Sequence, residues 1–417
     1  MLIFYRLITC LILIISPIIL VIRLLKKKED PKRFIEKFSF FSKKKNFGKL
    51  VWFHGASVGE LQSIMPLVEK LDKNKKIKQI LITSNTLSSS KIVKNFGFKK
   101  VIHQFFPIDI NFFSKRFLDY WQPSIVFFID SEIWPNMVLN LYTKNVPITL
   151  LNGRITNKTY NRWQKIPSTS KKIFGKFNLC LSSSQRTENY LKKLGVKNVK
   201  FFGNLKFSQS EKEKNYIDRD LKNFIKSKKA WCASSTHETE EMISGRVHLN
   251  LKKKYKNLLT IIIPRHIERV SSIKSDLLRL NLKVQTLESK QKLHKNSDIF
   301  VVDTYGQTKV FYSICKDVFL GGSLINHGGQ NPLEAARYGC NILHGSNISN
   351  FIEIYKFLRK NNMSKKVSSF KEVVNILNKS FIKKKDTKKI QKKLHLIGKK
   401  ILNNTIKEIR IFAKNEI

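Results

Sequence analysis

The chain has 417 residues, which at about 100 to 200 residues per domain predicts two or three folded domains. Hydrophobic residues make up 42% and aromatic residues 11% of the chain, so a disordered protein is excluded. The five cysteines form no C-x-x-C pair. This spacing argues against a structural zinc site and a disulfide framework, and it indicates reduced thiols in a cytosolic domain.

The chain is strongly basic, with 79 Lys and Arg against 30 Asp and Glu and a formal net charge of +49. Such a charge attracts nucleic acid, an anionic lipid leaflet or a phosphorylated substrate. Lysine is used throughout the chain alongside abundant Ile and Asn, so a genome-wide compositional bias is an alternative explanation of the charge. The charge alone does not choose among these partners.

The first residues form an apolar run, from Leu7 to Ile22, between two arginines and ahead of the basic cluster Lys26 to Lys28. The run is shorter than the roughly 20 residues of a typical transmembrane helix, but the first five residues add apolar length. We predict an uncleaved membrane-anchor helix in residues 1–28, either spanning the bilayer or lying in its interface. A signal peptide is the alternative, but no small-residue cleavage site follows. The basic cluster predicts that the remaining chain is cytoplasmic.

Beyond residue 48, short apolar runs alternate with helical stretches. The predicted strands are 49–54, 79–83, 124–129, 147–151, 179–182, 199–203, 230–234, 258–264, 283–287, 299–303, 318–321 and 341–344. Alternating strands and helices predict an α/β fold with parallel sheets covered on both faces.

A polar, charge-rich stretch from Phe207 to Lys229 has no strand pattern and indicates a domain boundary. We therefore predict two Rossmann-like, doubly wound domains, 29–208 and 209–417, which face each other across a cleft. The lysine-rich tail from Lys383 is predicted to be a terminal helix. Ligands of such domains bind beyond the carboxyl ends of the strands.

The loop after the first predicted strand is His54-Gly55-Ala56-Ser57-Val58-Gly59-Glu60. Glu60 falls in the first turn of the next helix, where the helix dipole favours the ionised carboxylate. An ionised carboxylate at this place can take a proton from a hydroxyl group. The alternative is an ordinary glutamate at a helix N-terminus.

Acidic and basic residues follow later strands of the same half. Asp130 and Glu132 come after the strand 124–129, and Asp130 alone has an evident alternative role as a helix cap. Arg154 and Lys206 follow two further strands, where a cation can meet a phosphate or a developing negative charge. Among 79 basic residues, a surface cation is the alternative for either.

The second half contains several polar or glycine-rich loops that follow strands or precede helices. They are Ser234 to Glu238, Pro264 to His266, Asp303 to Gln307, Gly321 to Ser323 and Gly328 to Glu334. Backbone N–H groups of such loops can bind an anion, and an arginine can hold a phosphate. Glu334 can accept hydrogen bonds from a ribose, so we predict a nucleotide or sugar-nucleotide pocket. The sequence has no P-loop signature, and the spacing of His237 and His266 does not support a metal site.

The series WFHGASVGE, DSEIWPN, LLNGRIT, GNLKF, ASSTHETEE, IIPRH, DTYGQ and GGSLINHGGQNPLEAARYG resembles the motifs of the 3-deoxy-D-manno-octulosonic acid (Kdo) transferase family. The resemblance extends from the N-terminal anchor to about Phe351. It implies a GT-B glycosyltransferase that moves Kdo, with inversion, from CMP-Kdo to the lipid A precursor (lipid IVA).

The resemblance also implies roles for particular residues. Glu60 corresponds to the general base of the family, and Glu132 and Lys206 to residues that support the transition state. The residues expected to hold CMP are Pro264, Arg265, Tyr305, Gly306, Gln307, Asn331, Pro332, Leu333 and Glu334. No metal and no cofactor besides the donor substrate are expected. Gln307 and Asp130 depart from the family pattern, which has an acidic residue and a glutamate, respectively.

The implied partners are CMP-Kdo, the phosphorylated lipid A precursor and the cytoplasmic face of the inner membrane, without nucleic acid. Two enzymatic alternatives are another GT-B sugar-nucleotide transferase and a sugar-nucleotide epimerase. A third alternative is a non-catalytic polyanion-binding membrane protein, whose binding would weaken steeply with salt. The sequence fixes neither the number of Kdo units added nor the oligomeric state.

Overall fold

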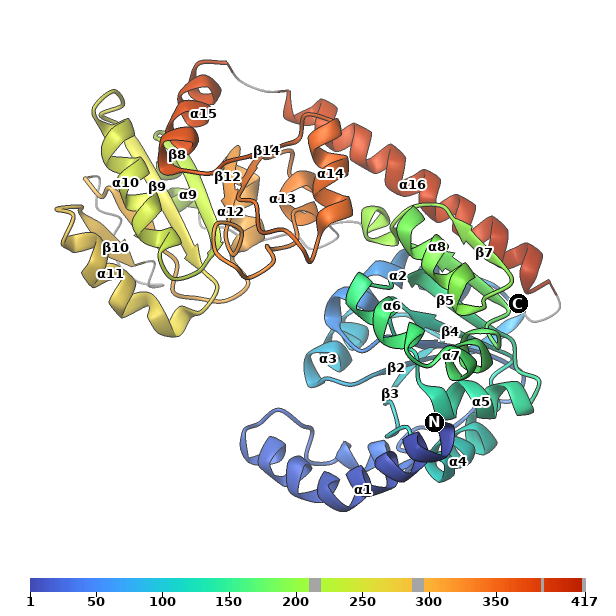
Figure 1. Cartoon of the computed structure of the whole chain (residues 1–417). Helices are drawn as coiled ribbons and strands as arrows, with labels where there is room; N and C mark the ends of the chain where they lie inside the picture. Colours follow the sequence, from blue (N-terminus) through green and yellow to red (C-terminus); the bar gives the residue numbers. More distant parts are fainter. Residues whose placement is uncertain (210–218, 287–295, 384–385, 415–417) are drawn as a thin grey trace. The chain divides into compact units, whose positions relative to one another are not determined.

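A computed structural model describes residues 1–209, 219–286, 296–383 and 386–414. The chain divides into two compact units (Figure 1). The first unit comprises Met1–Ser210 and Ile397–Ile417, and the second comprises Glu211–Leu396.

The first unit is built on a parallel sheet of seven strands in the order β3-β2-β1-β4-β5-β6-β7. The strands are β1 (Lys49–His54), β2 (Ile77–Ser84), β3 (Val101–Phe105), β4 (Ile125–Ile129), β5 (Ile148–Gly153), β6 (Leu179–Ser182) and β7 (Val199–Phe201). Their helices are α2 (Val58–Asp72), α3 (Leu87–Asn95), α4 (Asn111–Trp121), α5 (Pro135–Thr143), α6 (Asn157–Gln164), α7 (Pro167–Phe174) and α8 (Gln185–Leu194), with the short helix η2 (Leu205–Ser208) after β7.

The central strands are apolar on both faces because helices cover both faces of the sheet. Trp52 and Phe128 lie in the core cluster under α4, α5, α7 and α8. Phe53 and Phe127 lie in the opposite cluster, under α2 and α3. Successive residues of the central strands therefore alternate between two cores.

The second unit repeats this architecture with the strand order β10-β11-β9-β8-β12-β13-β14, again all parallel. Its strands are β8 (Lys229–Thr236), β9 (Leu258–Pro264), β10 (Val284–Thr286), β11 (Ile299–Val301), β12 (Asp317–Leu320), β13 (Asn341–His344) and β14 (Ser364–Lys366). Its helices are α9 (Arg219–Lys226), α10 (Glu240–Lys252), α11 (Val270–Leu278), α12 (Thr308–Ile314), α13 (Leu333–Arg337), α14 (Ile352–Lys360) and α15 (Phe370–Ile382), with the short helix η3 (Ile267–Arg269) before α11.

In each sheet the strand order reverses beside the first strand of the unit. β1 pairs with β2 on one side and with β4 on the other, and β8 pairs in the same way with β9 and β12. In folds with such a reversal of strand order, ligands bind outside the carboxyl ends of these strands. The motif-bearing loops of the sequence follow these strands.

The predicted α/β class with two doubly wound units is confirmed, and two strands were missed. β3 carries the polar pair His103 and Gln104, and β14 carries two lysines, so neither shows the apolar signal of a buried strand. The predicted linker from Phe207 to Lys229 contains α9 in its described part. The end of the predicted strand 283–287 lies outside the described residues.

The predicted second domain, 209–417, is wrong at its C-terminal end. The terminal helix α16 (Thr387–Phe412) begins in the second unit, but residues from Ile397 onward belong to the first. Ile401, Ile406 and Ile409 pack in the same core cluster as Leu205 of η2. The apolar face of this helix is buried in the first unit, and a sequence pattern does not reveal which core buries such a face.

Among the described residues, α1 (Leu2–Leu25) is the one helix long and apolar enough to cross a membrane by length and composition. Its most apolar 18-residue window has a mean hydropathy of 2.8 and is 17% buried.

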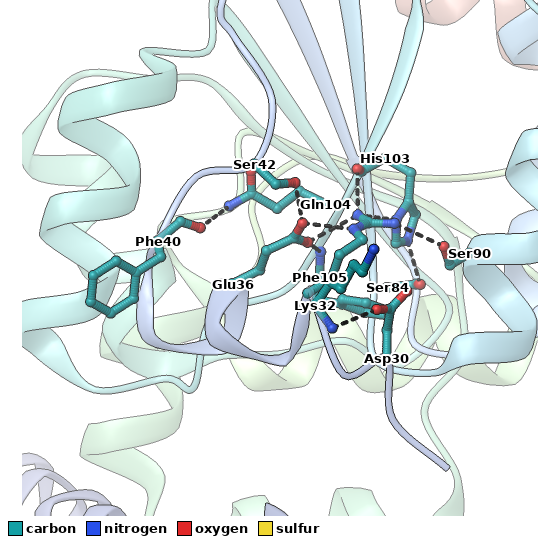
Figure 2. A network of polar contacts seen from close by, with 11 residues as sticks. Asp30, Lys32, Glu36, Phe40, Ser42, Ser84, Ser90, His103, Gln104 and Phe105 are labelled. Atoms are coloured by element: carbon teal, nitrogen blue, oxygen red, sulfur yellow. Dashed lines mark hydrogen bonds and ion pairs between the residues drawn. The ribbon is translucent and has the colours of Figure 1, made fainter. Parts of the chain in front are cut away.

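The segment after α1 is clamped to the edge strand β3 through η1 (Phe34–Phe38), as Figure 2 shows. Buried Glu36 accepts hydrogen bonds from the backbone N–H of Phe105 (2.7 Å), from Arg33 Nε (2.7 Å) and from the Ser42 hydroxyl. Arg33 also donates to the backbone oxygen of His103 (2.8 Å). Burial and the neighbouring guanidinium lower the pKa of His103 to about 3, so its ring is neutral at pH 7.

The Glu36 clamp generates a stability prediction. Glu36→Ala should lower the free energy of unfolding by about 3 kcal/mol, because it leaves the charge of the Arg33 guanidinium without its carboxylate partner in a mostly buried site. The control is Asp119→Ala, which removes a largely exposed ion pair with Lys144 and should cost less than about 1 kcal/mol. Chemical denaturation of both variants measures the difference, and equal losses would contradict a special role for Glu36.

Candidate functional site

Glu60 is held at the start of α2 by a capping box. Ser57 is the N-cap residue, and its hydroxyl oxygen accepts from the backbone N–H of Glu60 (3.4 Å). In return, the carboxylate accepts from the backbone N–H of Ala56 (2.7 Å) and from the Ser57 hydroxyl (2.8 Å). The helix-terminal role expected as the alternative for Glu60 is therefore real, and it fixes the carboxylate at the edge of the sheet.

The surroundings of Glu60 make it a stronger base than an ordinary glutamate. Burial raises its pKa to about 7, the negative charge of Glu132 contributes further, and the hydrogen bonds from Ser57 and Ala56 oppose the rise. Asp130 adds a smaller repulsion. A carboxyl group with a pKa near neutral can exchange a proton at physiological pH.

Glu132 is oriented by two aromatic side chains. Its Oε2 atom accepts from Trp134 Nε1 (2.8 Å) and lies 3.2 Å from His54 Nε2. The His54 ring is fully buried, stacks on Phe106 at a centroid distance of 3.8 Å and bonds Thr83 through Nδ1 (3.0 Å). The sequence analysis assigned no role to His54 or Trp134, although a histidine at the end of an otherwise apolar strand is a signal that could have found the first.

Asp130 binds Lys206 and does not cap the following helix. Its Oδ2 atom accepts from Lys206 Nζ (3.2 Å), and its backbone has a φ of 61° in the left-handed region. The N-terminus of α5 is capped by Asp109 instead, whose carboxylate accepts from the backbone N–H groups of Asn136 (3.0 Å) and Met137 (2.8 Å). The side chain of Asp130 is thus available for the cation after β7.

The fold brings the three predicted catalytic residues of the first unit together. Glu60 follows β1, Glu132 follows β4, and Lys206 lies in η2 after β7, linked to Asp130 by the ion pair. The backbone of Arg154 also reaches this edge, donating to the oxygen of Asp130 (2.9 Å). Glu60 thus lies at the same edge as the carboxylate of Glu132 and the ammonium group of Lys206. This arrangement suits removal of a proton from a hydroxyl group.

In the second unit, Glu240 organises the loops at the carboxyl edge. This fully buried residue accepts from the backbone N–H groups of His237 (3.0 Å), Gly322 (2.7 Å), Ser323 (3.1 Å) and Leu324 (3.1 Å). The glycine-rich loop 321–323 was expected to offer N–H groups to an anion. Two of its three N–H groups bind Glu240 instead, and that of Gly321 binds the oxygen of Ser234. Sequence analysis missed Glu240 because a helix-terminal glutamate carries no sign of its burial.

The predicted residue Arg265 lies beside a histidine cluster at the ends of β8 and β9. Its backbone N–H donates to the oxygen of Thr236 (2.9 Å), and its side chain is exposed. The ring centroid of His237 lies 4.1 Å from that of His327 and 5.9 Å from that of His266. Burial and these neighbouring groups lower the pKa of His237 to about 4. His237 is therefore a neutral hydrogen-bonding group at pH 7.

Two other predicted loops meet at α12 and α13. Thr308, directly after Gln307, donates its hydroxyl to Glu334 Oε2 (3.0 Å). Tyr305 is 58% exposed and donates to Glu268 (3.1 Å), and Gly306 has a φ of 85°, which favours glycine.

The remaining residues of the Asn331 to Glu334 motif have mainly structural contacts. Asn331 Oδ1 accepts from the backbone N–H of Leu333 (3.1 Å), Pro332 is the N-cap of α13, and the Leu333 side chain is buried. Pro264 is buried at the end of β9. In the part of the chain that the structure describes, no group of three or more His, Cys, Asp or Glu is placed to hold a metal ion.

Fold and sequence comparisons now define the class of protein. A solved structure of UDP-GlcNAc 2-epimerase from Neisseria meningitidis matches with a TM-score of 0.58 at 14% identity, covering 86% of this chain and 100% of that one. At such low identity this likeness shows the fold, which is of the GT-B type. The two doubly wound units are those of this fold class.

Sequence relatives narrow the class to one family. Residues 32–209 match the family described as 3-deoxy-D-manno-octulosonic-acid transferase (kdotransferase). The 3-deoxy-D-manno-octulosonic acid transferase of Rickettsia bellii is 32% identical over 374 residues, 89% of each chain. That of Haemophilus influenzae is 28% identical over 84% of each chain. The chain belongs to the Kdo transferase family, and it is a glycosyltransferase of Kdo transfer in lipopolysaccharide biosynthesis.

The raised pKa of Glu60 generates a prediction for stability. The pKa in the folded chain, about 7, lies above the ordinary value of 4.5, so folding retains a proton that the unfolded chain releases between these values. The free energy of unfolding therefore falls as pH rises through this window. Glu60→Gln should be more stable than the parent chain by about 2 kcal/mol at pH 8 and nearly equal to it at pH 4.5. Thermal unfolding at both pH values measures this, and a gain that does not change with pH would contradict the assignment.

Glu240 generates a second prediction. Glu240→Gln should destabilise the second unit by about 3 kcal/mol, because an amide presents an N–H group to backbone N–H groups that have no other partner. The control is Glu238→Gln, an exposed change two residues away in the chain. Differential scanning calorimetry of the two variants tests this, and an unchanged transition in Glu240→Gln would show that the carboxylate is dispensable.

Proposed function

We propose that this protein transfers Kdo from CMP-Kdo to a hydroxyl group of the phosphorylated lipid A precursor, lipid IVA, with inversion at the anomeric carbon. The single observation that carries the proposal is the carboxyl group of Glu60, whose pKa is raised to about 7 beside Glu132. Family membership supplies the sugar, and the resemblance of the motifs supplies the donor and the acceptor.

Glu60 is the proposed general base. It takes the proton of the acceptor hydroxyl while the oxygen attacks the anomeric carbon, and the bond from that carbon to the CMP phosphate oxygen breaks with its electron pair. Because the pKa of Glu60 is close to neutral, the group is both sufficiently charged and sufficiently basic. Glu132, held by Trp134 and His54, contributes the repulsion that keeps the pKa high.

Lys206 is the proposed source of positive charge for the transition state. The ammonium group pairs with Asp130 at 3.2 Å, and this contact fixes its position at the same edge as Glu60. Asp130 is shorter by one methylene than the glutamate of the family pattern, and the ion pair with Lys206 supports the view that it keeps the function.

The second unit is the proposed site of CMP-Kdo. Arg265 presents an exposed guanidinium, which suits a phosphate, at the end of β9. The proposed contacts for the nucleoside are two loops, Tyr305 to Gln307 and Asn331 to Glu334. The hydrogen bond from Thr308 to Glu334 links these loops. Gln307 offers a neutral hydrogen bond where the family pattern has an acidic residue. No metal or further cofactor is part of the proposal.

The proposed location is the cytoplasmic face of the inner membrane. The apolar helix α1 and the formal charge of +49 support it, because an anionic leaflet and an anionic lipid acceptor both attract a basic protein.

The experiment is mass spectrometry of lipid IVA after incubation with the detergent-solubilised protein and a CMP-Kdo-generating system. The parent chain should add the mass of one or more Kdo units. Glu60→Gln should reduce the turnover number by about 10³-fold, the middle of the usual range for a general base, and leave CMP-Kdo binding intact. The matched control is Glu69→Gln on the same helix, at a partly exposed position, which should retain activity.

The pH dependence separates a base from a structural glutamate. The turnover number should rise as pH increases through about 7, because only the ionised carboxylate accepts a proton. Full turnover by Glu60→Gln would exclude Glu60 as the base. Absence of any mass increase with the folded parent chain would exclude this donor and acceptor pair.

A further inference from the structure

Helix α1 has two clearly different faces along its whole length. The less exposed positions recur every three or four residues and form a stripe: Leu2, Tyr5, Thr9, Leu13, Ser16, Leu20, Arg23 and Leu24. This spacing places them on one side of a helix. The remaining large apolar residues are exposed: Ile3, Phe4, Leu7, Ile8, Leu11, Ile12, Ile14, Ile15, Ile18, Ile19, Val21, Ile22 and Leu25. The stripe begins at Leu2, which packs against the core cluster of the first unit, and continues along the helix through the buried residues Thr9, Ser16 and Leu20.

The N-terminal end of α1 is fastened to the first unit by polar contacts. The Tyr5 hydroxyl donates to Asp109 Oδ2 (2.8 Å), and Arg6 Nε donates to Asn136 Oδ1 (3.2 Å). Asp109 is 3% exposed and is the residue that caps α5, and Leu2 packs against the core cluster of this unit. These contacts place the beginning of the helix on the folded unit.

The C-terminal end is fastened to the same unit. Arg23 Nε donates to Glu29 Oε1 (2.6 Å), and Lys37 Nζ donates to the same oxygen (2.6 Å). The following residues, Arg33 and Glu36, form the clamp on β3 that Figure 2 shows. Both ends of α1 therefore lie on one folded, polar-surfaced body.

These contacts are incompatible with a helix that crosses the bilayer. The 24 residues of α1 span about 36 Å, and a crossing would separate the two ends by a hydrocarbon core of about 30 Å. The contacts of Tyr5 and Arg6 would then break, because an α/β unit with a charged surface cannot follow them through the lipid.

We propose that α1 lies in the plane of the membrane surface, with its stripe against the first unit, its apolar face in the lipid and both ends on the cytoplasmic side. The occupant of the apolar face is an anionic bilayer, since Lys26, Lys27 and Lys28 follow the helix and suit anionic headgroups. This inference rests on the membrane location proposed above.

The contacts of Tyr5 with Asp109 and of Arg6 with Asn136 also link α1 to the proposed catalytic edge. Asn136 and Asp109 lie at the N-terminus of α5, which begins directly after Trp134, the donor to Glu132. The anchor thus holds the carboxyl edge that carries Glu60 and Glu132 at a set position against the lipid surface. Tyr5 and Arg6 are positioning residues for that edge.

Labelling of two reporter cysteines tests the topology without reference to activity. In a Cys10→Ser background the remaining four cysteines are buried. One reporter is a Cys-Gly-Ser extension in front of Leu2, and the other is Lys28→Cys. A membrane-impermeant maleimide should label both in inverted inner-membrane vesicles, at least tenfold more than in intact spheroplasts. Labelling of the N-terminal reporter in spheroplasts would show a spanning helix and overturn the proposal. That result would leave the proposed Kdo transfer untouched, because transfer is measured separately.

A photo-cross-linker distinguishes the two faces of α1. p-Benzoylphenylalanine in place of Leu13 should cross-link within the chain, whereas at the neighbouring, 73% exposed Ile14 it should cross-link to lipid. Both variants are tested in native membranes and read by mass spectrometry. A spanning helix would cross-link to lipid at both positions. Recovery of the protein in the soluble fraction would overturn the membrane location itself, a result separate from either labelling pattern.

Discussion

The burial of Glu60 beside other carboxylates at the edge of the first sheet is the constraint on which the proposed chemistry depends. Glu60, Glu132 and Asp130 come from loops after two adjacent strands, β1 and β4, and a parallel sheet brings such loops to one edge. The fold restrains each carboxylate separately, with a capping box for Glu60, aromatic donors for Glu132 and an ammonium group for Asp130. Burial raises the pKa of Glu60, and the charges of Glu132 and Asp130, which cannot move away, raise it further. The proton affinity that a base requires is thus a product of the sheet topology.

The two units use buried carboxylates in opposite ways. In the second unit Glu240 also lies at the start of a helix, but four backbone N–H groups surround it and bind its charge. Such a carboxylate supports the loops and has no capacity left for a ligand. Glu60 receives two hydrogen bonds and two negative neighbours. The same residue type in a strand-to-helix turn is therefore structural in the second unit, whereas in the first unit it is the proposed base.

In the proposed arrangement, helix α1 joins this edge to the membrane. Asp109 accepts from Tyr5 and also caps α5, so one buried carboxylate binds both α1 and the helix after the acidic motif. A lipid acceptor presents its sugar at the membrane surface. A catalytic edge held in a fixed position relative to that surface loses less conformational entropy when the acceptor binds. The clamp of Arg33 and Glu36 gives the other end of the anchor the same rigidity.

The sequence by itself determined the α/β class, most strands and the loops that carry the site, because continuous apolar runs and glycine-rich turns are local signals. The limits of β1, β6, β9 and β13 follow directly from these runs. The motif series indicated the family and the residues Glu60, Glu132 and Lys206. Only the tertiary structure decided that Asp130 binds Lys206, that Glu240 fills the glycine-rich loop and that residues from Ile397 onward return to the first unit. Each of these depends on which distant side chain fills a buried space, and such contacts leave no periodic or local pattern in the chain.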